Sequence, residues 1–357
     1  MSNSIYVFME SDFSDKIDKI VLRNYEKATC GLTLGIVHDK KTVYKKSFGS
    51  IEKLNFKYTD ETIYDLASLT KPLITATLIG KLLEKGEISL DDNLKTIGFI
   101  KNSNIDNVTI KSLISHSTGF IPTYPLYKMG KNKKSYIKAI DLLYNGEIYK
   151  KEVYSDLNFI LLGFIIEYFY NDTLDNVAKK ELIDPLNLKN TSYNPEYTDL
   201  IAPTEVTTRG LLRGKVHDEK AYYIGGVAGH AGLFSNINDL IIFMNKFLNG
   251  EILKGKTIDL FTTLQNKYLN GTFGYGWMVK TQRPENPSEA YGYSAFMGDY
   301  LPYGSFGHTG FTGTSIVVNK NNNLFSILLT NRVYPTRDNT NILKFRRILN
   351  NAIFMDF

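Results

Sequence analysis

Strand patterns at the two ends of the chain constrain its fold more than any other feature. Two strand pairs are predicted, each joined by a short polar turn: residues 31–38 with 42–48, and residues 313–318 with 324–330. If the terminal strands pair with each other, both ends of the chain contribute to one antiparallel sheet. The middle of the chain is then a long insertion into that sheet.

Helical periodicity fills most of the remaining chain. Apolar residues recur at helical spacing in residues 12–25, 73–83, 108–114, 137–143, 159–169 and 341–354. The predicted fold is therefore α/β (α+β), an antiparallel sheet flanked by helices, with an inserted and mostly helical lobe. We expect one domain over residues 1–357, with a sheet lobe from about 1–65 and 205–357 and a helical lobe from about 66–204.

The composition of the chain limits which binding partners and which cellular location can be expected. The net charge of +5 is spread along the chain, and the densest basic patch, residues 131–134, is interpreted as a solvated loop, so we expect no nucleic-acid partner. The chain has neither an export signal at its start nor a stretch of roughly 18 apolar residues, which predicts a cytoplasmic protein with no membrane span. Cys30 cannot form an intrachain disulfide and is interpreted as a buried structural thiol.

Ser68-Leu69-Thr70-Lys71 is the first candidate catalytic motif. On a helix, a hydroxyl and an amine three residues apart share one face and can hydrogen-bond, which is the minimum for a serine nucleophile with a lysine base. The same spacing occurs at Ser50 and Ser135, but only Ser68 begins a long apolar helix. An N-capping serine followed by a surface lysine is the alternative interpretation.

Two further motifs place polar groups beside apolar segments. Tyr154-Ser155-Asp156 precedes a buried helix, and Tyr154 could transfer protons if a cation such as Lys71 lies nearby. His308-Thr309-Gly310 precedes a strand-like segment, where a substrate could lie along the backbone and contact His308 and Thr309. The alternatives are a core tyrosine and a structural histidine at a strand entry.

Taken in this order, the three motifs resemble those of the serine β-lactamase and penicillin-binding-protein superfamily. The resemblance is greatest to the branch of class C β-lactamases, DD-peptidases and esterases, and residues 229–235 look like those of cell-wall amidase-like members. It implies that Ser68 forms the acyl-enzyme and that Lys71 and Tyr154 transfer protons. It also implies an oxyanion hole made by the N–H groups of Ser68 and Phe311.

Two positions depart from the pattern of the family. Asp156 stands where many members have asparagine, so a carboxylate replaces the usual amide contact to the substrate, and an amine near the scissile bond is expected. His308 stands where β-lactamases usually have lysine, which weakens the fixed positive charge for a β-lactam carboxylate. With Thr309, Gly310 and Phe311, these residues are the predicted substrate-binding set.

Rival sites have weaker support. Residues 250–257 satisfy the P-loop pattern, but the segment before them is predicted to be a helix, whereas a P-loop follows a strand. His217, Asp218 and His230 lack a recognised metal spacing, and the roles of His217 and His230 stay open. His116 with Ser115 and Ser117 is a weaker candidate for another hydrolase site. We therefore expect no metal and no organic cofactor.

The predicted function is a serine hydrolase that acts through an acyl-enzyme on an amide or ester bond. The expected substrate is a small peptide or a cell-wall-derived fragment. β-Lactamase, DD-carboxypeptidase and carboxylesterase activities remain alternatives because they share the nucleophile. A penicillin-binding or sensor module, in which Ser68 is acylated without turnover, is the non-enzymatic alternative.

Overall fold

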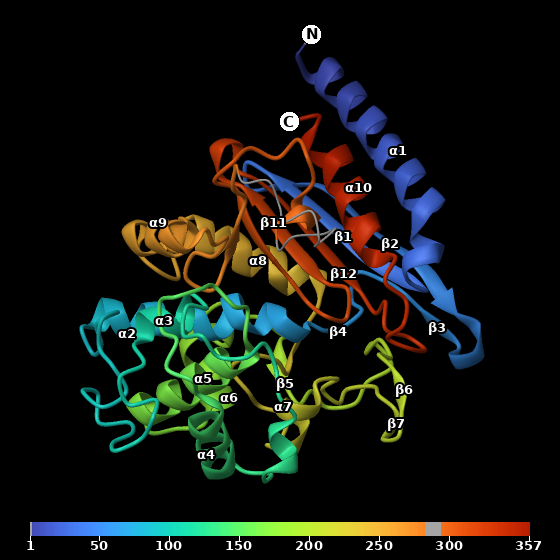
Figure 1. Ribbon diagram of the computed structural model, residues 1–357. Coiled ribbons are helices and arrows are strands. Elements are labelled where there is room, and N and C mark those ends of the chain that lie inside the picture. The colour runs from blue at the N-terminus through green and yellow to red at the C-terminus, as the bar shows by residue number, and fades with distance from the viewer. Residues whose placement is uncertain (1, 283–293) are drawn as a thin grey trace.

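A seven-stranded sheet forms the upper part of the molecule (Figure 1). The computed structural model describes residues 2–282 and 294–357, with side chains from residue 12 onward. The strands, in their order across the sheet, are β3 (Phe56–Lys57), β2 (Lys41–Ile51), β1 (Gly31–His38), β12 (Leu324–Thr330), β11 (Ser315–Asn319), β10 (Phe306–Thr309) and β9 (Met278–Val279). Each neighbouring pair is antiparallel.

The two ends of the chain meet at the centre of this sheet. β1 pairs with β12, so that Leu32 lies opposite Thr330 and His38 lies opposite Leu324. The predicted pairing of the terminal strands is therefore confirmed. Alternate side chains of β12 point to opposite faces, and the strand is buried throughout and mostly apolar because both faces are covered by helices.

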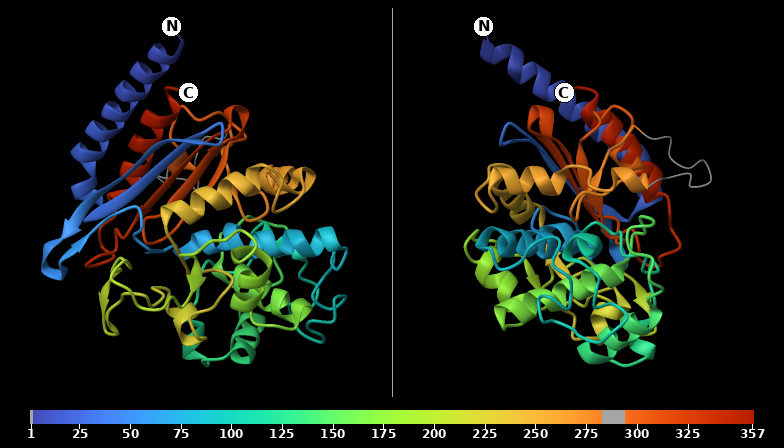
Figure 2. Two further views of the ribbon diagram at one scale, coloured as in Figure 1. Left: turned by 180° about the vertical axis from the view of Figure 1, so that it is seen from behind. Right: turned by 60° about the vertical axis from the view of Figure 1, so that its left-hand side comes forward.

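Two helices cover each face of the sheet. On one face, α1 (Ser2–Ala28) and α10 (Ile342–Phe354) pack side by side, and the opposite face is covered by α8 (Ile237–Leu248) followed by α9 (Gly255–Thr262) (Figure 2). Gly35 shows how close the second layer is, because a Cβ there would lie 2.9 Å from the Ile237 side chain. The predicted helices at 12–25 and 341–354 are confirmed.

The remaining helices lie together below the sheet in Figure 1. They are α2 (Thr77–Lys85), α3 (Ile110–Ile114), α4 (Lys133–Leu143), α5 (Asp156–Tyr170), α6 (Leu174–Ala178) and α7 (Glu219–Tyr223). The central member is α5, in which residues 157–166 are all buried, so it is apolar on every side. The division of the chain into lobes at residues 65 and 204 stays a prediction.

Short strands connect the seven-stranded sheet to the helices below it. β4 (Tyr64–Asp65), β8 (Leu233–Ser235) and β5 (Ser192–Tyr193) form a small sheet, and β6 (Val206–Thr207) pairs with β7 (Gly210–Leu211) in a projecting hairpin. The chain turns from β4 into a helical run that starts at residue 67 and continues through wide π-helical turns at Lys71–Ala76 into α2. Among the described helices, none is both long and apolar enough to span a membrane.

The C-terminal strand prediction needs one correction. The segment predicted as a strand from residue 313 becomes β11 only at Ser315, and His308 and Thr309 belong to a strand of their own, β10. Gly310 and Gly313 lie in the turn between β10 and β11, where Gly313 has a φ of 110° that favours glycine. β10 has only four residues, one of them Gly307, and Gly310 follows it, so it shows little periodicity and the pattern did not predict this strand.

Candidate active site

Ser68 and Lys71 lie in direct contact at the start of the helical run. Lys71 Nζ is 2.8 Å from Ser68 Oγ, and it also donates to Asp156 Oδ1 at 2.9 Å and to the His230 carbonyl at 3.2 Å. The ammonium group of Lys71 is thus surrounded by acceptors, and Tyr154 also hydrogen-bonds to it. Burial lowers the pKa of Lys71, but attraction by Asp156 and Tyr154 outweighs it and leaves the pKa above its usual value.

Tyr154 completes this group from the loop that precedes α5. The Lys71 ammonium lies 4.9 Å from the centre of its ring, and the ring packs against Phe273 and His116 at 5.7 and 4.8 Å between centres. Burial raises the pKa of Tyr154, while attraction by Lys71 and hydrogen bonding with Lys71 and Ser68 act in the opposite direction. The structure therefore brings the three predicted catalytic residues together.

Asp156 is bound by two lysines instead of facing an open pocket. Oδ1 accepts from Lys71, and Oδ2 lies 3.2 Å from Nζ of Lys220 in α7. Burial would raise the pKa of Asp156, but Lys71 and Lys220 hold it well below its usual value. Ser155, the residue before it, caps α5 by accepting from the Leu157 N–H, which fixes the start of the helix on which Asp156 lies.

His308 lies in β10, next to the edge strand β9, and it is buried. Its side chain is fully enclosed, and Nδ1 donates to the Thr309 carbonyl at 2.9 Å. Burial and the nearby Lys71 lower the pKa of His308 to about 3, so the ring is neutral at physiological pH. The next three residues, Thr309, Gly310 and Phe311, line a pocket instead.

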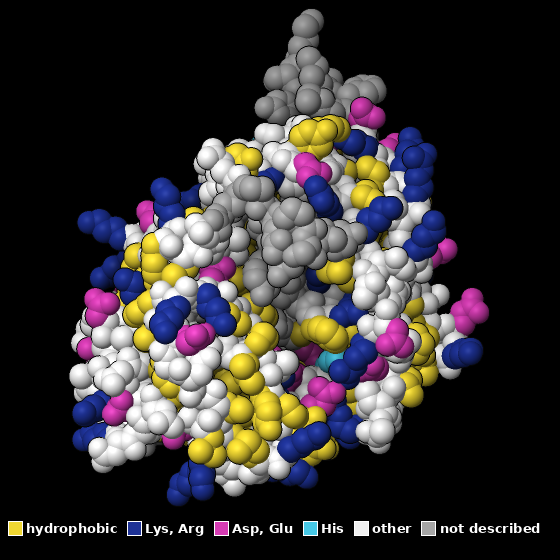
Figure 3. All heavy atoms as spheres, viewed as in Figure 1, with side chains coloured by type: hydrophobic (Ala, Val, Ile, Leu, Met, Phe, Trp, Pro, Cys, Tyr) yellow, Lys and Arg dark blue, Asp and Glu magenta, His cyan; other side chains and the backbone are white. Residues whose placement is uncertain are grey.

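That pocket has a volume of about 370 Å³ and opens beside the nucleophile. Its lining residues come from the Ser68 turn, the loop before α5, strand β9, the end of β10 and the turn after it, the segment after β12 and the start of α10: Ser68, Tyr154, Met278, Thr309, Gly310, Phe311, Arg332, Thr340, Ile342, Leu343 and Arg346. The face shown in Figure 3 is hollowed near its centre, where acidic, basic and histidine side chains gather. Three of the five predicted substrate-binding residues therefore lie in one pocket with Ser68 and Tyr154.

The end of β10 is held close to the Ser68 turn. Thr314 Oγ1 donates to the Leu66 carbonyl at 3.1 Å, and a Cβ on Gly310 would lie 2.4 Å from that same oxygen. Only glycine allows this approach. The two residues whose backbone N–H groups are expected to form the oxyanion hole, Ser68 and Phe311, both line the pocket.

Two arginines in the pocket wall were missed by the sequence analysis. Arg346 donates to the carbonyl groups of Gly310 and Thr314 at 2.9 and 2.8 Å, and Arg332 donates to the Phe311 carbonyl at 2.8 Å. Among the described carboxylates, none lies within 4 Å of either guanidinium. Burial and repulsion by Arg332 lower the pKa of Arg346 to about 9, which still leaves it cationic at neutral pH. No local pattern marks either arginine.

The other sequence candidates have structural partners. His217 lies 2.7 Å from Glu205, and His230 lies 2.8 Å from Asp218. Oxygens of Asp156 and Asp218 and a nitrogen of His230 lie within 4.8 Å of one another, but Lys71 and Lys220 already bond to these carboxylates. We therefore interpret this cluster as an ion-pair network.

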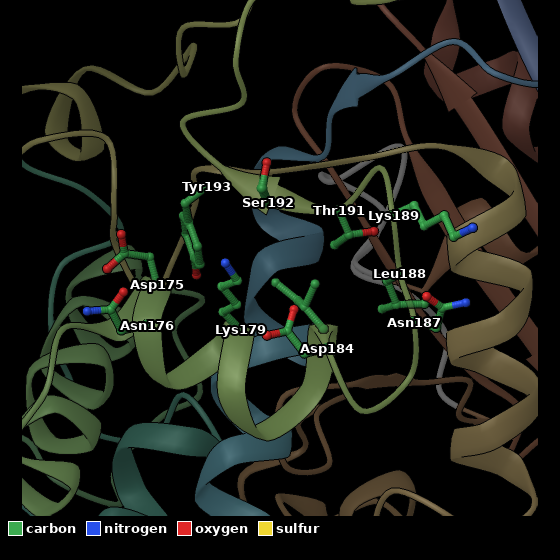
Figure 4. A pocket seen from close by; sticks show the side chains of 11 residues that line it. Asp175, Asn176, Lys179, Asp184, Asn187, Leu188, Lys189, Thr191, Ser192 and Tyr193 are labelled. Atoms are coloured by element: carbon green, nitrogen blue, oxygen red, sulfur yellow. The ribbon is translucent and has the colours of Figure 1, made fainter.

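The P-loop pattern and Cys30 lie outside this site. Residues 250–257 follow helix α8 and run into α9, so the segment lacks the preceding strand that a P-loop needs. Cys30 is only partly buried, and its Sγ lies 3.2 Å from the Tyr58 hydroxyl. A second hollow of about 490 Å³ lies between α6 and β5, lined by polar residues such as Lys179, Asp184 and Tyr193 (Figure 4). It contains none of the predicted catalytic residues.

The fold and this site together define a serine hydrolase of the penicillin-recognising type. An antiparallel sheet covered by helices positions a serine and a lysine at the start of a buried helix, beside a tyrosine and an open pocket. The family model described as Beta-lactamase matches residues 15–350, and the chain belongs to this family. The family resemblance and the fold class predicted from the sequence are therefore confirmed.

Known proteins similar to this chain agree with that assignment. A protein of Escherichia coli O157:H7 named "Putative D-alanyl-D-alanine carboxypeptidase" is 32% identical over 91% of this chain and 83% of its own length. The solved structure of EstCE1, a hydrolase with promiscuous acyltransferase activity, has a TM-score of 0.74 at 17% identity, covering 97% of this chain and 100% of that one. The D-amino acid amidase of Ochrobactrum anthropi SV3 has a TM-score of 0.69 at 16% identity, covering 97% and 99%. The last two similarities concern the fold alone.

Proposed function

We propose that Ser68 attacks the carbonyl carbon of an amide or ester and forms an acyl-enzyme, which water then hydrolyses. The observation that carries this proposal is the contact of 2.8 Å between Ser68 Oγ and the buried Lys71 Nζ, behind a pocket that Ser68 and Tyr154 line. Attack forms the Oγ–C bond, and collapse of the tetrahedral intermediate breaks the bond from carbon to the leaving group. Water repeats the sequence and frees Ser68.

Lys71 and Tyr154 act as one proton-transfer pair. When the pair has lost one of its protons, it accepts the hydroxyl proton of Ser68 during attack and then returns a proton to the departing amine or alcohol. Because the two groups interact closely, the pH profile reports the pair as a unit. The N–H groups of Ser68 and Phe311 are the proposed donors to the oxyanion, which develops where β10 meets the Ser68 turn.

For the substrate, we propose a small peptide or cell-wall-derived fragment that ends in a free carboxylate. Two cationic side chains, Arg332 and Arg346, line the pocket that contains Ser68, and they supply the positive charge that the neutral His308 does not. The carboxypeptidase name carried by the relative from Escherichia coli supports a substrate of this kind. Direct contact of Asp156 or His308 with the substrate has no support in their surroundings, because two lysines bind Asp156 and His308 is enclosed.

The test compares an acylated peptide ending in D-Ala-D-Ala with the same peptide capped as its C-terminal amide. Release of D-alanine from the free acid should have a kcat/KM at least about tenfold above cleavage of the amide, because only the free acid can form charge-assisted bonds to the arginines. Ser68→Ala should abolish both reactions. Equal rates on the two peptides would contradict the proposed carboxylate recognition. Ser68-dependent cleavage of simple esters or β-lactams alone would mean that the protein is an esterase or a β-lactamase and not a peptidase.

A further inference from the structure

A closed ring of buried and partly buried polar groups lies behind the reacting pair. Lys71 bonds to Asp156, Asp156 to Lys220, and Lys220 to Asp218, with distances of 2.9, 3.2 and 2.9 Å. The ring of His230 bonds to Asp218 at 2.8 Å, while the carbonyl of the same residue accepts from Lys71 at 3.2 Å. The network therefore begins and ends at the amine that contacts Ser68.

Lys220 is held in place independently of Asp156. It lies in α7, whose N-terminus is capped by the Asp218 side chain through the N–H of Ala221 at 2.9 Å. The Lys220 carbonyl accepts from the hydroxyl of Tyr136, a residue that is itself fully buried. Because both its backbone and its ammonium group are fixed, the positive charge of Lys220 is held next to Asp156.

The charge balance explains why a second lysine is needed. A carboxylate at position 156 with Lys71 as its only cationic partner would hold the proton of Lys71 tightly in this buried setting, and Lys71 could then hardly exchange protons with Ser68. Lys220 competes for the same carboxylate through its second oxygen. The two lysines thus share one negative charge from Asp156, and Asp218 balances the other.

We propose that Lys220, held by Asp218, is a positioning residue for the reaction: it occupies the second oxygen of Asp156 and so weakens the hold of that carboxylate on Lys71. This inference rests on the proposed function of Ser68 and Lys71. Asp156, which stands where many family members have asparagine, then has a role in the reaction, because the aspartate and Lys220 act together.

Other titratable groups near Lys71 do not replace this effect. His116 and His308 are both buried, and burial together with repulsion by Lys71 lowers the pKa of each, so both rings are neutral at physiological pH. Tyr154 contacts Lys71 directly and titrates with it. The charges that can be altered without touching the reacting groups are therefore those of Lys220 and Asp218.

The experiment measures the rate constant for fluorophosphonate labelling of Ser68 as a function of pH, with intact-mass detection. Lys220→Met removes a positive charge and should move the pH midpoint of the labelling rate upward by about one pH unit or more. Asp218→Asn removes a negative charge and should move the midpoint downward. Lys133→Met is the matched control, because Lys133 pairs with Glu167 on a solvent-exposed face and should leave the midpoint unchanged.

The two directions separate a charge effect from a structural one. A midpoint that stays in place in both variants, with only the rate reduced, would overturn the inference, and so would shifts of the same sign. If Lys220→Met fails to fold, the downward shift expected for Asp218→Asn decides alone. Absence of any Ser68-dependent label in the unaltered protein refutes the proposed function, whereas labelling with unmoved midpoints refutes only the role of Lys220.

Discussion

Glu205 lies behind Phe311 in the pocket wall. Its replacement should change the free energy of unfolding by an amount whose pH dependence can be calculated. Its carboxylate, buried at 5% exposure, accepts from the Arg337 side chain at 2.7 and 3.0 Å and from His217 at 2.7 Å. The His217 ring stacks on Phe311 with 5.5 Å between centres. Burial would raise the pKa of Glu205, but Arg337 and His217 lower it to about 2.

The magnitude follows from that pKa. The usual value for the group is 4.5, and the difference of about 2.5 pH units corresponds to about 3.4 kcal/mol at neutral pH. Arg337 is 38% exposed, so solvent screening reduces the expected contribution to about 2 kcal/mol. Because the pKa is lower in the folded state, this stability is present above about pH 4.5 and is lost as the pH falls towards 2.

The assay is urea unfolding followed by the fluorescence of Trp277, the one tryptophan of the chain, which is buried. At pH 7, Glu205→Gln should have a free energy of unfolding about 2 kcal/mol below that of the unaltered protein. At pH 3.5 the gap should shrink by roughly a third to a half. A gap that is equally large at both pH values, or that widens in acid, would refute the electrostatic reasoning.

Three other substitutions test the close contacts around the site. Gly229→Ala should lower the free energy of unfolding by about 2 kcal/mol or more, because the new Cβ would lie 2.1 Å from the Phe159 carbonyl in α5; an unchanged melting temperature contradicts this. Asp65→Ala should cost about 2–4 kcal/mol in urea unfolding, since it leaves the buried N–H groups of Ala67 and His217 without their acceptor, bonded now at 2.8 and 2.7 Å. A loss below about 1 kcal/mol would show that water or other groups replace the carboxylate. The side chain of Phe311 is 48% exposed in the pocket, so Phe311→Ala should raise KM with little change in melting temperature. A large loss of stability without a change in KM would count against a place for Phe311 in the binding pocket.

The sequence predicted the parts of the fold that depend on local periodicity. The paired terminal strands and the long helices follow from apolar spacing, and Ser68 and Lys71 are three residues apart on one helical run. What the sequence could not supply are contacts between distant segments. Lys71 and Asp156 are separated by 85 positions, and no pattern indicates that Lys220 lies on the far side of that aspartate.

The binding pocket shows the same limit. Thr309 and Gly310 were predicted from a glycine-rich segment and Phe311 from the family resemblance, and all three line the pocket. Arg332 and Arg346 join them because the segment after β12 and helix α10 both reach the turn after β10, where the two arginines donate to the carbonyl groups of Phe311 and Gly310. These contacts depend on pairing across the whole chain. A lone arginine in a strand end or a helix carries no signal of such a position.

The most direct test of the central claim is intact-mass spectrometry after exposure to a fluorophosphonate, with the unaltered protein and Ser68→Ala compared side by side. The account predicts one covalent adduct on the unaltered chain, located on Ser68 by peptide mapping, and no adduct on the variant. An adduct that persists in Ser68→Ala, or that maps to another residue, would contradict the assignment of Ser68 as the nucleophile.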